Sequence, residues 1–238
     1  MATIPSFDSS QFFSDSWLDE SECINAPQQE RGRQTLIKIL VAAKKLFLSK
    51  GFDETTIMEI SRLSGISVGS IYHRFPDKTA IFLAIHEAYR KARIEQIDEA
   101  IARQKRAIQS AVDVLSFHVG IVFDAARNDQ IYLRLVERQR ISNPLVNDLQ
   151  LQWDDDFCKK LLSLYLPHKK QIKHPDLEQA IRYLHHTLRG VTLWSILPSP
   201  SPHQFLNVDQ EDFQEQAYRM SAMYLGIKVS STRARAAP

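Results

Sequence analysis

The sequence contains few of the residues on which two common architectures depend. Its 238 residues include seven glycines and two cysteines, and they contain no run of alternating Val, Ile or Thr. Because a β-sheet is built from such alternation and from turn glycines, the chain is predicted to be mostly helical. Cys23 and Cys158 lie far apart in the sequence, so they predict neither a disulfide framework nor a metal-binding knuckle.

Other absences concern membranes and catalysis. No run of 18 apolar residues occurs, and the first thirty residues hold no basic residue of the kind that opens a signal peptide. We therefore expect a cytoplasmic protein without a membrane partner. The sequence also lacks a His-Glu-x-x-His motif, a phosphate-binding loop and a nucleophile turn.

Two runs of ionisable residues could serve catalysis, namely 154–156 (Asp-Asp-Asp) and the pair His185-His186. Consecutive side chains on a helix point about 100° apart, so neither run can surround a metal by itself. The sequence therefore predicts no catalytic residue, no metal site and no cofactor.

The charge is distributed unevenly along the chain. Residues 1–30 carry six acidic and no basic side chains, residues 31–106 carry fifteen basic and eight acidic ones, and the remainder is nearly balanced. The positive excess in the middle segment agrees with a nucleic-acid-binding surface there. Residues 1–30 are expected to form a disordered acidic tail, and residues 229–238 a second disordered tail. Alternatively, the N-terminal arm with its scattered aromatic residues folds over the basic domain or over a partner.

Residues 51–78 show the signals of two short helices joined by a tight turn. Thr56 and Glu59 form a capping-box pattern, which predicts a helix that begins at Ile57. Ile57, Ile60 and Leu63 lie on one face at helical spacing, and Gly65 suits the left-handed residue that ends a helix.

A second helix is expected to follow at once. Ser67 can cap it, and its opening residues, Val68, Gly69 and Ser70, are too small to fill a core but suit an approach to base edges. This helix must end by Phe75, because a residue before proline is disfavoured in helical conformation.

The next helix is expected to begin at Asp77 as its N-cap. Lys78 would then place an ammonium group at the helix opening, where phosphate is attracted by free N–H groups.

Together these residues resemble the TetR family of bacterial transcription regulators. The resemblance covers about residues 33–90 and rests on Gly51-Phe52, Thr55-Thr56, Ile60, Gly65-Ile66-Ser67, Gly69-Ser70-Ile71-Tyr72, Phe75-Pro76 and Lys78. Ser61 and Ser64 depart from the family, which usually has alanine at those positions, but a serine hydroxyl can bond to a carbonyl one turn earlier. The resemblance implies an all-α fold: an N-terminal three-helix helix-turn-helix DNA-binding domain joined by a long helix to an α-helical ligand-binding and dimerisation domain.

The expected DNA contacts fall into two groups. Contacts with phosphates are predicted for Thr56, His73 and Lys78. Contacts in the groove are predicted for Ser67, Val68, Gly69, Ser70 and Tyr72, and Tyr72 could serve either role. With Thr55 from the family signature, the predicted DNA-binding residues are Thr55, Thr56, Ser67, Val68, Gly69, Ser70, Tyr72, His73 and Lys78. Arg31 and Arg33 could also reach into a minor groove as an arm.

Helical periodicity organises the rest of the chain. A supporting helix is predicted over 33–49, with Phe47, Phe52, Ile60, Ile71 and Phe75 in a small common core. A helix over 77–105 is long enough to connect two bodies, and in the TetR family this helix transmits the ligand signal. Five more helices are predicted near 108–127, 129–141, 144–166, 175–197 and 209–226. We therefore predict a DNA-binding domain over 31–78, with the start of the linking helix to about 90, and a regulatory and dimerisation domain over 79–228.

Two features of the second domain bear on its partners. The helices near 175–197 and 209–226 have apolar arcs wide enough for two neighbours each, which predicts a homodimer through these helices rather than a larger monomer core. His118 is a lone titratable residue in an apolar central helix, so it is a candidate polar contact for an unknown small-molecule effector. The predicted pocket residues are Phe117, His118, Phe123, Trp153, Tyr183, His185 and Trp194, although each is also a reasonable core residue.

The sequence thus predicts a homodimeric transcriptional regulator, a repressor that a small ligand releases from an inverted-repeat double-stranded DNA operator. One alternative is a DNA-binding protein of the same fold without a small-molecule inducer, either a protein-partnered regulator or a nucleoid-associated division factor. A third hypothesis, an enzyme tethered to DNA, requires converging ionisable groups in the second domain.

Overall fold

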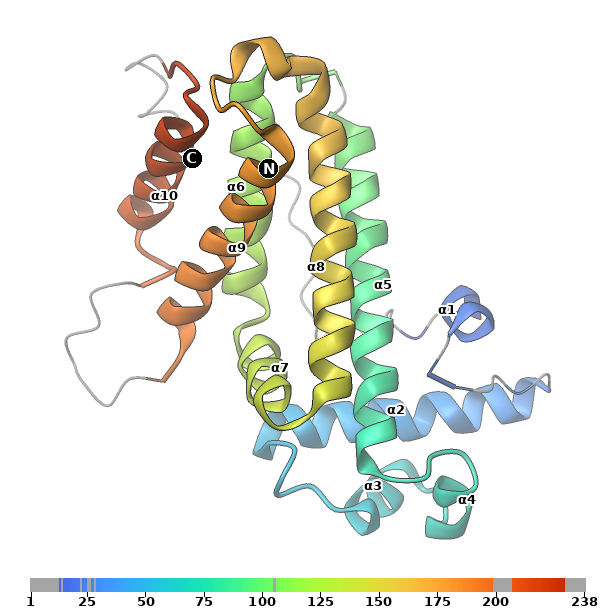
Figure 1. Cartoon of the computed structure of the whole chain (residues 1–238). Coiled ribbons are helices and arrows are strands. Elements are labelled where there is room, and N and C mark those ends of the chain that lie inside the picture. The colour runs from blue at the N-terminus through green and yellow to red at the C-terminus, as the bar shows by residue number, and fades with distance from the viewer. Residues whose placement is uncertain are drawn as a thin grey trace. The chain divides into compact units, whose positions relative to one another are not determined.

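A computed structural model describes residues 13, 15–21, 23–24, 27, 29–104, 106–198 and 207–229. These residues form helices and connecting turns, and no strand occurs among them (Figure 1). The all-α prediction is therefore confirmed. Among the described helices, none has both the length and the apolar character that crossing a bilayer requires.

The helices follow one another with short connections. The first five are α1 (Asp15–Glu20), α2 (Glu30–Lys50), α3 (Ile57–Ser64), α4 (Val68–Tyr72) and α5 (Lys78–Gln104). The remainder are α6 (Ala111–Asn128), α7 (Gln130–Ser142), α8 (Pro144–Tyr165), the 3-10 helix η2 (Leu166–Gln171), α9 (Leu177–Ile196) and α10 (Glu211–Leu225). From α2 onward these bounds lie within about three residues of the predicted ones, because local capping signals set them.

Three of those signals are visible in the backbone. Gly51 and Gly65 end α2 and α3 with positive φ angles of 91° and 71°, which a residue with a Cβ rarely adopts. Asp77 accepts a hydrogen bond from the Ala80 N–H at 2.8 Å, as expected of the N-cap of α5.

The described residues divide into two compact units. One contains the described residues up to Gln96 together with Leu135–Leu149, and the other contains Ile97–Arg134 and the described residues from Gln150 onward. Helix α5 begins in the first unit and ends in the second, so the division falls inside this helix. The predicted boundary after residue 78 marks only the end of the helix-turn-helix segment.

The first unit has a small aromatic core beneath α3 and α4. Phe47, Phe75 and Phe82 are almost completely buried, as are Ile60 and Ile71. The Phe52 ring lies 5.3 Å from Phe47 and 5.6 Å from Phe82, measured between ring centres. These contacts confirm the predicted core and anchor one side of each short helix.

The expectation of a disordered tail over residues 1–30 is wrong for the part that the structure describes. Residues 15–20 form α1, and the side chains of Trp17 and Leu18 are 1% exposed. Sequence periodicity could not reveal this helix, because it is only six residues long and is stabilised by contacts with distant residues. Phe7 and Phe12 of the same arm, and residues 230–238 of the predicted C-terminal tail, lie outside the described residues.

In the second unit α6 is buried nearly all round, as predicted. Its buried residues include Ala111, Val114, Leu115, Val119, Ile121, Phe123 and Ala126. The neighbouring helices α9 and α10 supply most of the partners, among them Ile181, Leu184, Leu188, Ala217 and Leu225. An apolar helix of this kind folds only as the centre of a larger core.

The acidic run at 154–156 ties α8 to α9 in this unit. Asp154 is buried, forms an ion pair with Arg189 and accepts a hydrogen bond from the Gln150 side chain. Asp155 pairs with Lys159 and Arg182, whose hydrogen bonds hold the pKa of this carboxyl below its ordinary value. These carboxylates are engaged in structural ion pairs.

Two buried histidines meet between α6, α8 and α9. His118 Nε2 lies 3.3 Å from His185 Nδ1, and His118 Nδ1 lies 3.4 Å from the Tyr165 hydroxyl. All three side chains are at most 3% exposed. Burial lowers the pKa of His118 to about 3 and lowers that of His185 well below its ordinary value, so both rings are neutral at physiological pH.

This pair predicts a loss of stability in mild acid. In the unfolded chain His118 binds a proton below about pH 6.5, whereas in the folded chain it does so only near pH 3. The free energy of unfolding should therefore fall as pH decreases through this window, by up to about 1.4 kcal/mol per pH unit for each such histidine. Urea titrations at several pH values should show a shallower acid slope for His118→Phe. The exposed His73, replaced by Phe, serves as the control, and an unchanged slope in His118→Phe would contradict the assignment.

Candidate nucleic-acid interface

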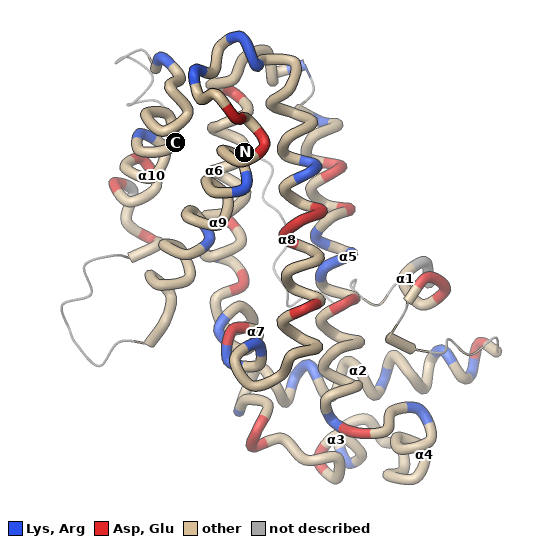
Figure 2. The backbone as a smooth tube through the Cα atoms, in the orientation of Figure 1, with Lys and Arg blue, Asp and Glu red and all other residues tan. Residues whose placement is uncertain are grey.

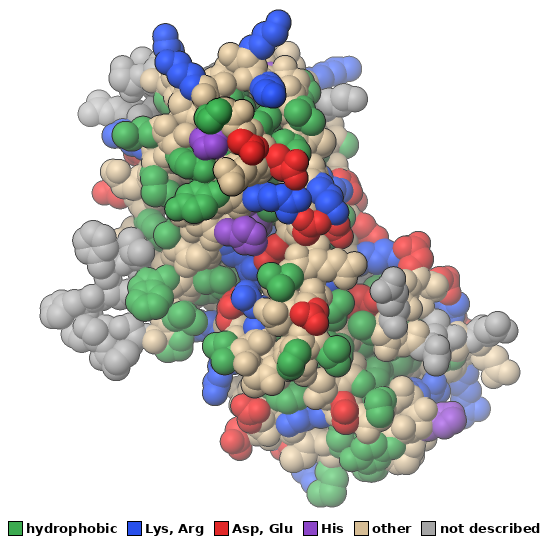
Figure 3. Space-filling view, in the orientation of Figure 1, with side chains coloured by type: hydrophobic (Ala, Val, Ile, Leu, Met, Phe, Trp, Pro, Cys, Tyr) green, Lys and Arg blue, Asp and Glu red, His purple; other side chains and the backbone are tan. Residues whose placement is uncertain are grey.

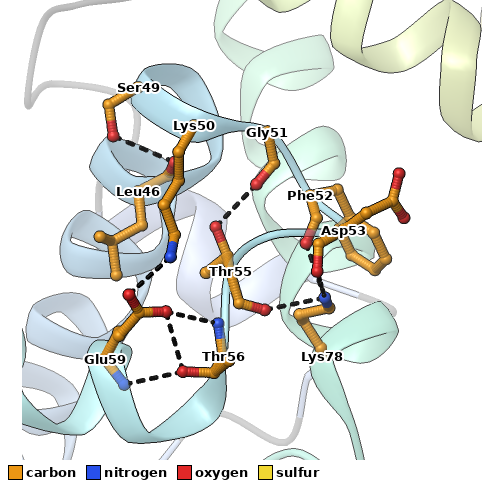
Figure 4. Close-up of polar contacts among 10 residues, drawn as sticks. All are labelled: Leu46, Ser49, Lys50, Gly51, Phe52, Asp53, Thr55, Thr56, Glu59 and Lys78. Carbon is orange, nitrogen blue, oxygen red and sulfur yellow. Dashed lines mark hydrogen bonds and ion pairs between the residues drawn. The ribbon is translucent and has the colours of Figure 1, made fainter.

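The start of α3 is fixed by a complete capping box. The Glu59 N–H donates to the Thr56 hydroxyl at 3.3 Å, and the Thr56 N–H donates to the Glu59 carboxylate at 3.0 Å (Figure 4). The Lys50 ammonium lies 2.5 Å from the same carboxylate. The hydrogen bond from Lys50, followed by those from Thr56, lowers the pKa of Glu59 to about 2. The predicted capping box is confirmed, and Lys50 is an additional member that the sequence pattern did not indicate.

The turn between α3 and α4 is closed by serine side chains. The Ser61 hydroxyl donates to the Ile66 carbonyl at 2.6 Å, and the Ile66 N–H donates to the Ser64 hydroxyl at 3.3 Å. Ser64 also lies 3.4 Å from the Ser61 carbonyl. Ser61 was expected to bond backward along its helix, but it bonds forward into the turn. Both departures from the family pattern therefore stabilise the turn that positions α4.

Helix α4 has one anchored and one free side. The buried Ile71 attaches it to the core, and the Ser67 hydroxyl accepts the Ser70 N–H at 3.2 Å as its N-cap. Ser67, Gly69 and Ser70 are exposed, and a Cβ added at Gly69 would have no atom within 4 Å. A short helix with small exposed side chains at its opening can approach base edges closely.

The remaining predicted contacts differ in accessibility. Tyr72 and His73 are exposed at the end of α4, and Thr56 is exposed at the start of α3. Val68 is half-buried. Thr55, however, is 1% exposed, and its hydroxyl donates to the Gly51 carbonyl at 2.7 Å. The side chain of Thr55 therefore shapes the loop and is not placed to contact DNA, which corrects the prediction for this residue.

Helix α3 exposes residues that were not among the predicted DNA contacts. Met58 is 66% exposed, and Arg62 is exposed one turn later. Leu63 was assigned to the packed face with Ile57 and Ile60, but it is 46% exposed. Within α3, only Ile60 is fully buried. Helical spacing counted from Ile60 would have placed Met58 and Arg62 on the free side.

Lys78 has a structural role that the sequence did not predict. Its ammonium donates to the carbonyls of Phe52, Thr55 and Asp53 at 2.6, 2.8 and 3.2 Å, and it lies 4.4 Å from the centre of the Phe52 ring (Figure 4). Partial burial lowers the pKa of this amine. The side chain therefore ties the start of α5 to the loop that precedes α3, and a phosphate contact by Lys78 stays a prediction.

The candidate effector residues do not form one pocket. Phe117 lines a hollow of about 230 Å³ against the last turns of α5, together with Ala100, Gln104, Ala107, Ile108, Asp113, Ser116, Gly120, Ile121 and Asp124. Gly120 is buried, yet a Cβ added there would have no atom within 4 Å, so it lies on the open floor of this hollow.

The other candidates lie elsewhere in the second unit. His118 and His185 meet in the buried cluster described above, and Trp153 is stacked on Phe157, whose ring centre is 4.9 Å from that of His185. Within the described part of the chain, neither Trp153 Nε1 nor His185 Nε2 has a hydrogen-bond partner. Phe123 is a core residue packed on Phe213 at 5.1 Å.

Tyr183 and Trp194 are exposed rather than enclosed among the residues that the structure describes. They are 61% and 70% exposed on α9, and Met220 and Met223 are 43% and 82% exposed on α10. In Figure 3 apolar side chains gather over this face. Along α9 and its C-cap, the accessible positions alternate at spacings of four and three residues, which is the spacing of a helix–helix seam; they carry Tyr183, Thr187, Gly190, Trp194 and Leu197.

The ammonium of Lys78 predicts a stability effect. Lys78→Met keeps most of the aliphatic stem but removes three hydrogen bonds from a charged group, so it should lower the free energy of unfolding by roughly 1–3 kcal/mol. Urea denaturation measures this change, with the exposed Lys38→Met on α2 as the matched control. Equal stability of the two variants would show that the ammonium does not hold the loop and is available for phosphate.

Comparison with known proteins agrees with this geometry. Residues 39–85 match the family model described as "Bacterial regulatory proteins, tetR family". Among characterised relatives, the HTH-type transcriptional repressor BepR of Brucella suis is 40% identical over 52 residues, which cover 22% of this chain and 25% of that one. The chain spans between 25% and 55% of the length of the curated relatives it matches.

Solved structures extend the similarity of fold over most of the chain. Salmonella enterica GusR gives a TM-score of 0.57 at 21% identity and covers 84% of this chain and 98% of its own. RolR in complex with the ligand resorcinol gives 0.55 at 16% identity and covers 85% and 91%. The relatives are transcription regulators and repressors, which agrees with the expectation of a regulator rather than an enzyme. Residues 39–85 therefore form a domain of the TetR family of bacterial regulatory proteins.

Proposed function

We propose that this chain is a homodimeric transcriptional repressor that binds an inverted-repeat operator and is released from it by a small ligand. The observation that carries the proposal is the opening of α4. Its exposed small side chains are held by the Ser67 cap, the Ser61 bond into the turn and the buried Ile71. A rigid helix with a free, narrow tip suits insertion into a major groove. Such a role on DNA also implies a cytoplasmic, nucleoid-associated location.

The exposed face of α9 and α10 supports the homodimer. Trp194 and Met223 present large apolar surfaces, and Gly190 lies between Tyr183 and Trp194 on the same face with no atom within 4 Å of an added Cβ. A small residue in the middle of a seam lets two helix backbones approach closely. Two such helices from each of two chains would form a four-helix interface, and the resulting two-fold symmetry matches an inverted repeat.

The hollow beside Phe117 and Gly120 supports the ligand response. Its volume of about 230 Å³ lies below the range of roughly 300–1,000 Å³ typical of drug-sized ligands, which favours a compact effector. Resorcinol, bound to the structurally similar RolR, is a ligand of that kind. An effector here would touch Ala100 and Gln104 near the end of α5, the helix that begins at Lys78. It would change DNA affinity only by binding two arrangements of α5 with unequal affinity.

DNA recognition can be tested without knowing the operator. Repeated selection from a library of random duplexes should enrich an inverted repeat. Gly69→Leu should then reduce the preference for the enriched duplex over a scrambled one by roughly 1–3 kcal/mol per lost base contact. The substitution meets open space in the free protein, so it should leave the fold intact. Fluorescence titrations at several salt concentrations measure the preference.

The control for this experiment is Glu95→Leu, at an exposed position of α5 outside the motif. It should retain the preference of the unmodified protein. If the library gives no enriched sequence, or if Gly69→Leu retains full preference, α4 is not the reading element.

The ligand response predicts a second, separable effect. Gly120→Leu should fill the hollow from its floor, and the variant should lose the response to any compact molecule that raises the melting temperature of the unmodified protein and lowers its operator affinity. Mass spectrometry of the gently purified protein would reveal a retained ligand as a starting compound. Operator binding without ligand should be unchanged. An effector that acts equally on Gly120→Leu would place its site elsewhere, and absence of any effector would favour the same-fold regulator without an inducer.

A further inference from the structure

Helix α1 has no part in DNA recognition as described above, yet it is firmly attached. Trp17 and Leu18 are 1% exposed, Phe13 is 6% exposed, and the rings of Phe13 and Trp17 lie 5.7 Å apart. Burial of this extent in a six-residue helix requires a matching apolar surface, because so short a helix is unstable alone. Figure 1 shows α1 in the angle between α2 and the first part of α5.

Polar contacts attach α1 to both of those helices. On α5, Glu87 accepts a hydrogen bond from Trp17 Nε1 at 3.1 Å, and Lys91 forms an ion pair with Glu20. On α2, Arg33 forms an ion pair with Asp19. Figure 2 shows acidic residues on α1 and basic residues on the neighbouring α2 and α5. The helix therefore bridges α2 and α5, which also meet each other at the rings of Phe47 and Phe82, whose centres lie 6.0 Å apart.

Pro27, which precedes α2, contacts the first turn of that helix. Arg33 Nε donates to the Pro27 carbonyl at 3.1 Å. A Cβ at Gly32 would lie 2.6 Å from the Pro27 Cβ, which is closer than two carbon atoms can approach. Only glycine at position 32 allows Pro27 to cover the first turn of α2 in this way.

We propose that α1 is a strap that holds α5 at a fixed angle to α2. Because α1 is bound to both helices, a change in that angle must break its contacts with one of them. The ion pairs are partly exposed and contribute little by themselves, so the buried Trp17 and Leu18 supply most of the attachment. The strap therefore restricts the angle of the helix that leaves the DNA-binding unit, and it presets the arrangement that binds DNA.

The effect of the strap on DNA affinity rests on the proposed function. Its attachment to α2 and α5 does not. A preset arrangement avoids the cost of ordering α5 when the operator binds. Arg33 is engaged by Asp19 and Pro27, so the strap also keeps this side chain from acting as a free minor-groove arm.

Hydrogen–deuterium exchange of the full-length protein tests the strap directly. In Trp17→Ala and in Gly32→Ala, amides of α5 around 84–93 should exchange at least about threefold faster, because local opening no longer has to break the bridge. Amides of α3 and α4 should be unaffected.

The charge-only variant Asp19→Asn/Glu20→Gln should show a smaller change in the same direction, and Glu95→Gln on the exposed side of α5 serves as its control. Gly32→Ala keeps α1 itself and adds a helix-favouring residue to α2, so a change in it cannot be attributed to a weakened helix.

Operator titrations complete the test. Affinity for the selected duplex should fall by about three- to tenfold in Trp17→Ala, while affinity for a scrambled duplex stays nearly constant. Unchanged exchange in α5 would overturn the strap. Tighter binding of both duplexes would also overturn it, because that result means that the acidic arm acts as an electrostatic shield. If the unmodified protein selects no duplex, the proposed function fails, and the exchange data still decide the question of the strap.

Discussion

The position of α4 depends on one cluster of backbone carbonyls. Phe52, Asp53 and Thr55 direct their carbonyls at a single point, and the Lys78 ammonium occupies it. This arrangement joins the loop before α3 to the first residue of α5. The capping box of Thr56 and Glu59 then starts α3 in a fixed direction from the same loop. Helix α4 has only five residues. Its exposed tip is consequently held from both sides in the sequence, by α3 before it and by the start of α5 after it.

Much of this arrangement could be predicted from the sequence, because it is encoded locally. The capping residues Thr56, Ser67 and Asp77 and the left-handed Gly65 fix helix ends through neighbours a few residues away. For the same reason the bounds of α5 to α10 follow closely from periodicity and proline breaks.

Features that depend on distant residues could not be predicted in this way. Trp17 looks like part of a polar tail until Glu87, seventy residues later, is placed beside it. Lys78 looks like a free cation until the carbonyl of Phe52 is seen within 2.6 Å of it. The same limit applies to the candidate effector residues. Helical spacing put Trp194 on a defined face of α9, but tertiary packing decides whether that face meets a pocket, a core or a second chain. In one chain the Trp194 side chain is 70% exposed.

In the proposed function, the opening of α4 reads DNA while Lys78 and the helix caps hold it in place. A crystal structure of the protein with a selected duplex tests this claim most directly. It is predicted to show two copies of the chain related by a two-fold axis, with Ser67, Gly69 and Ser70 of each copy at base edges in successive major grooves. A complex in which these residues face solvent, and DNA lies against another surface, would contradict it.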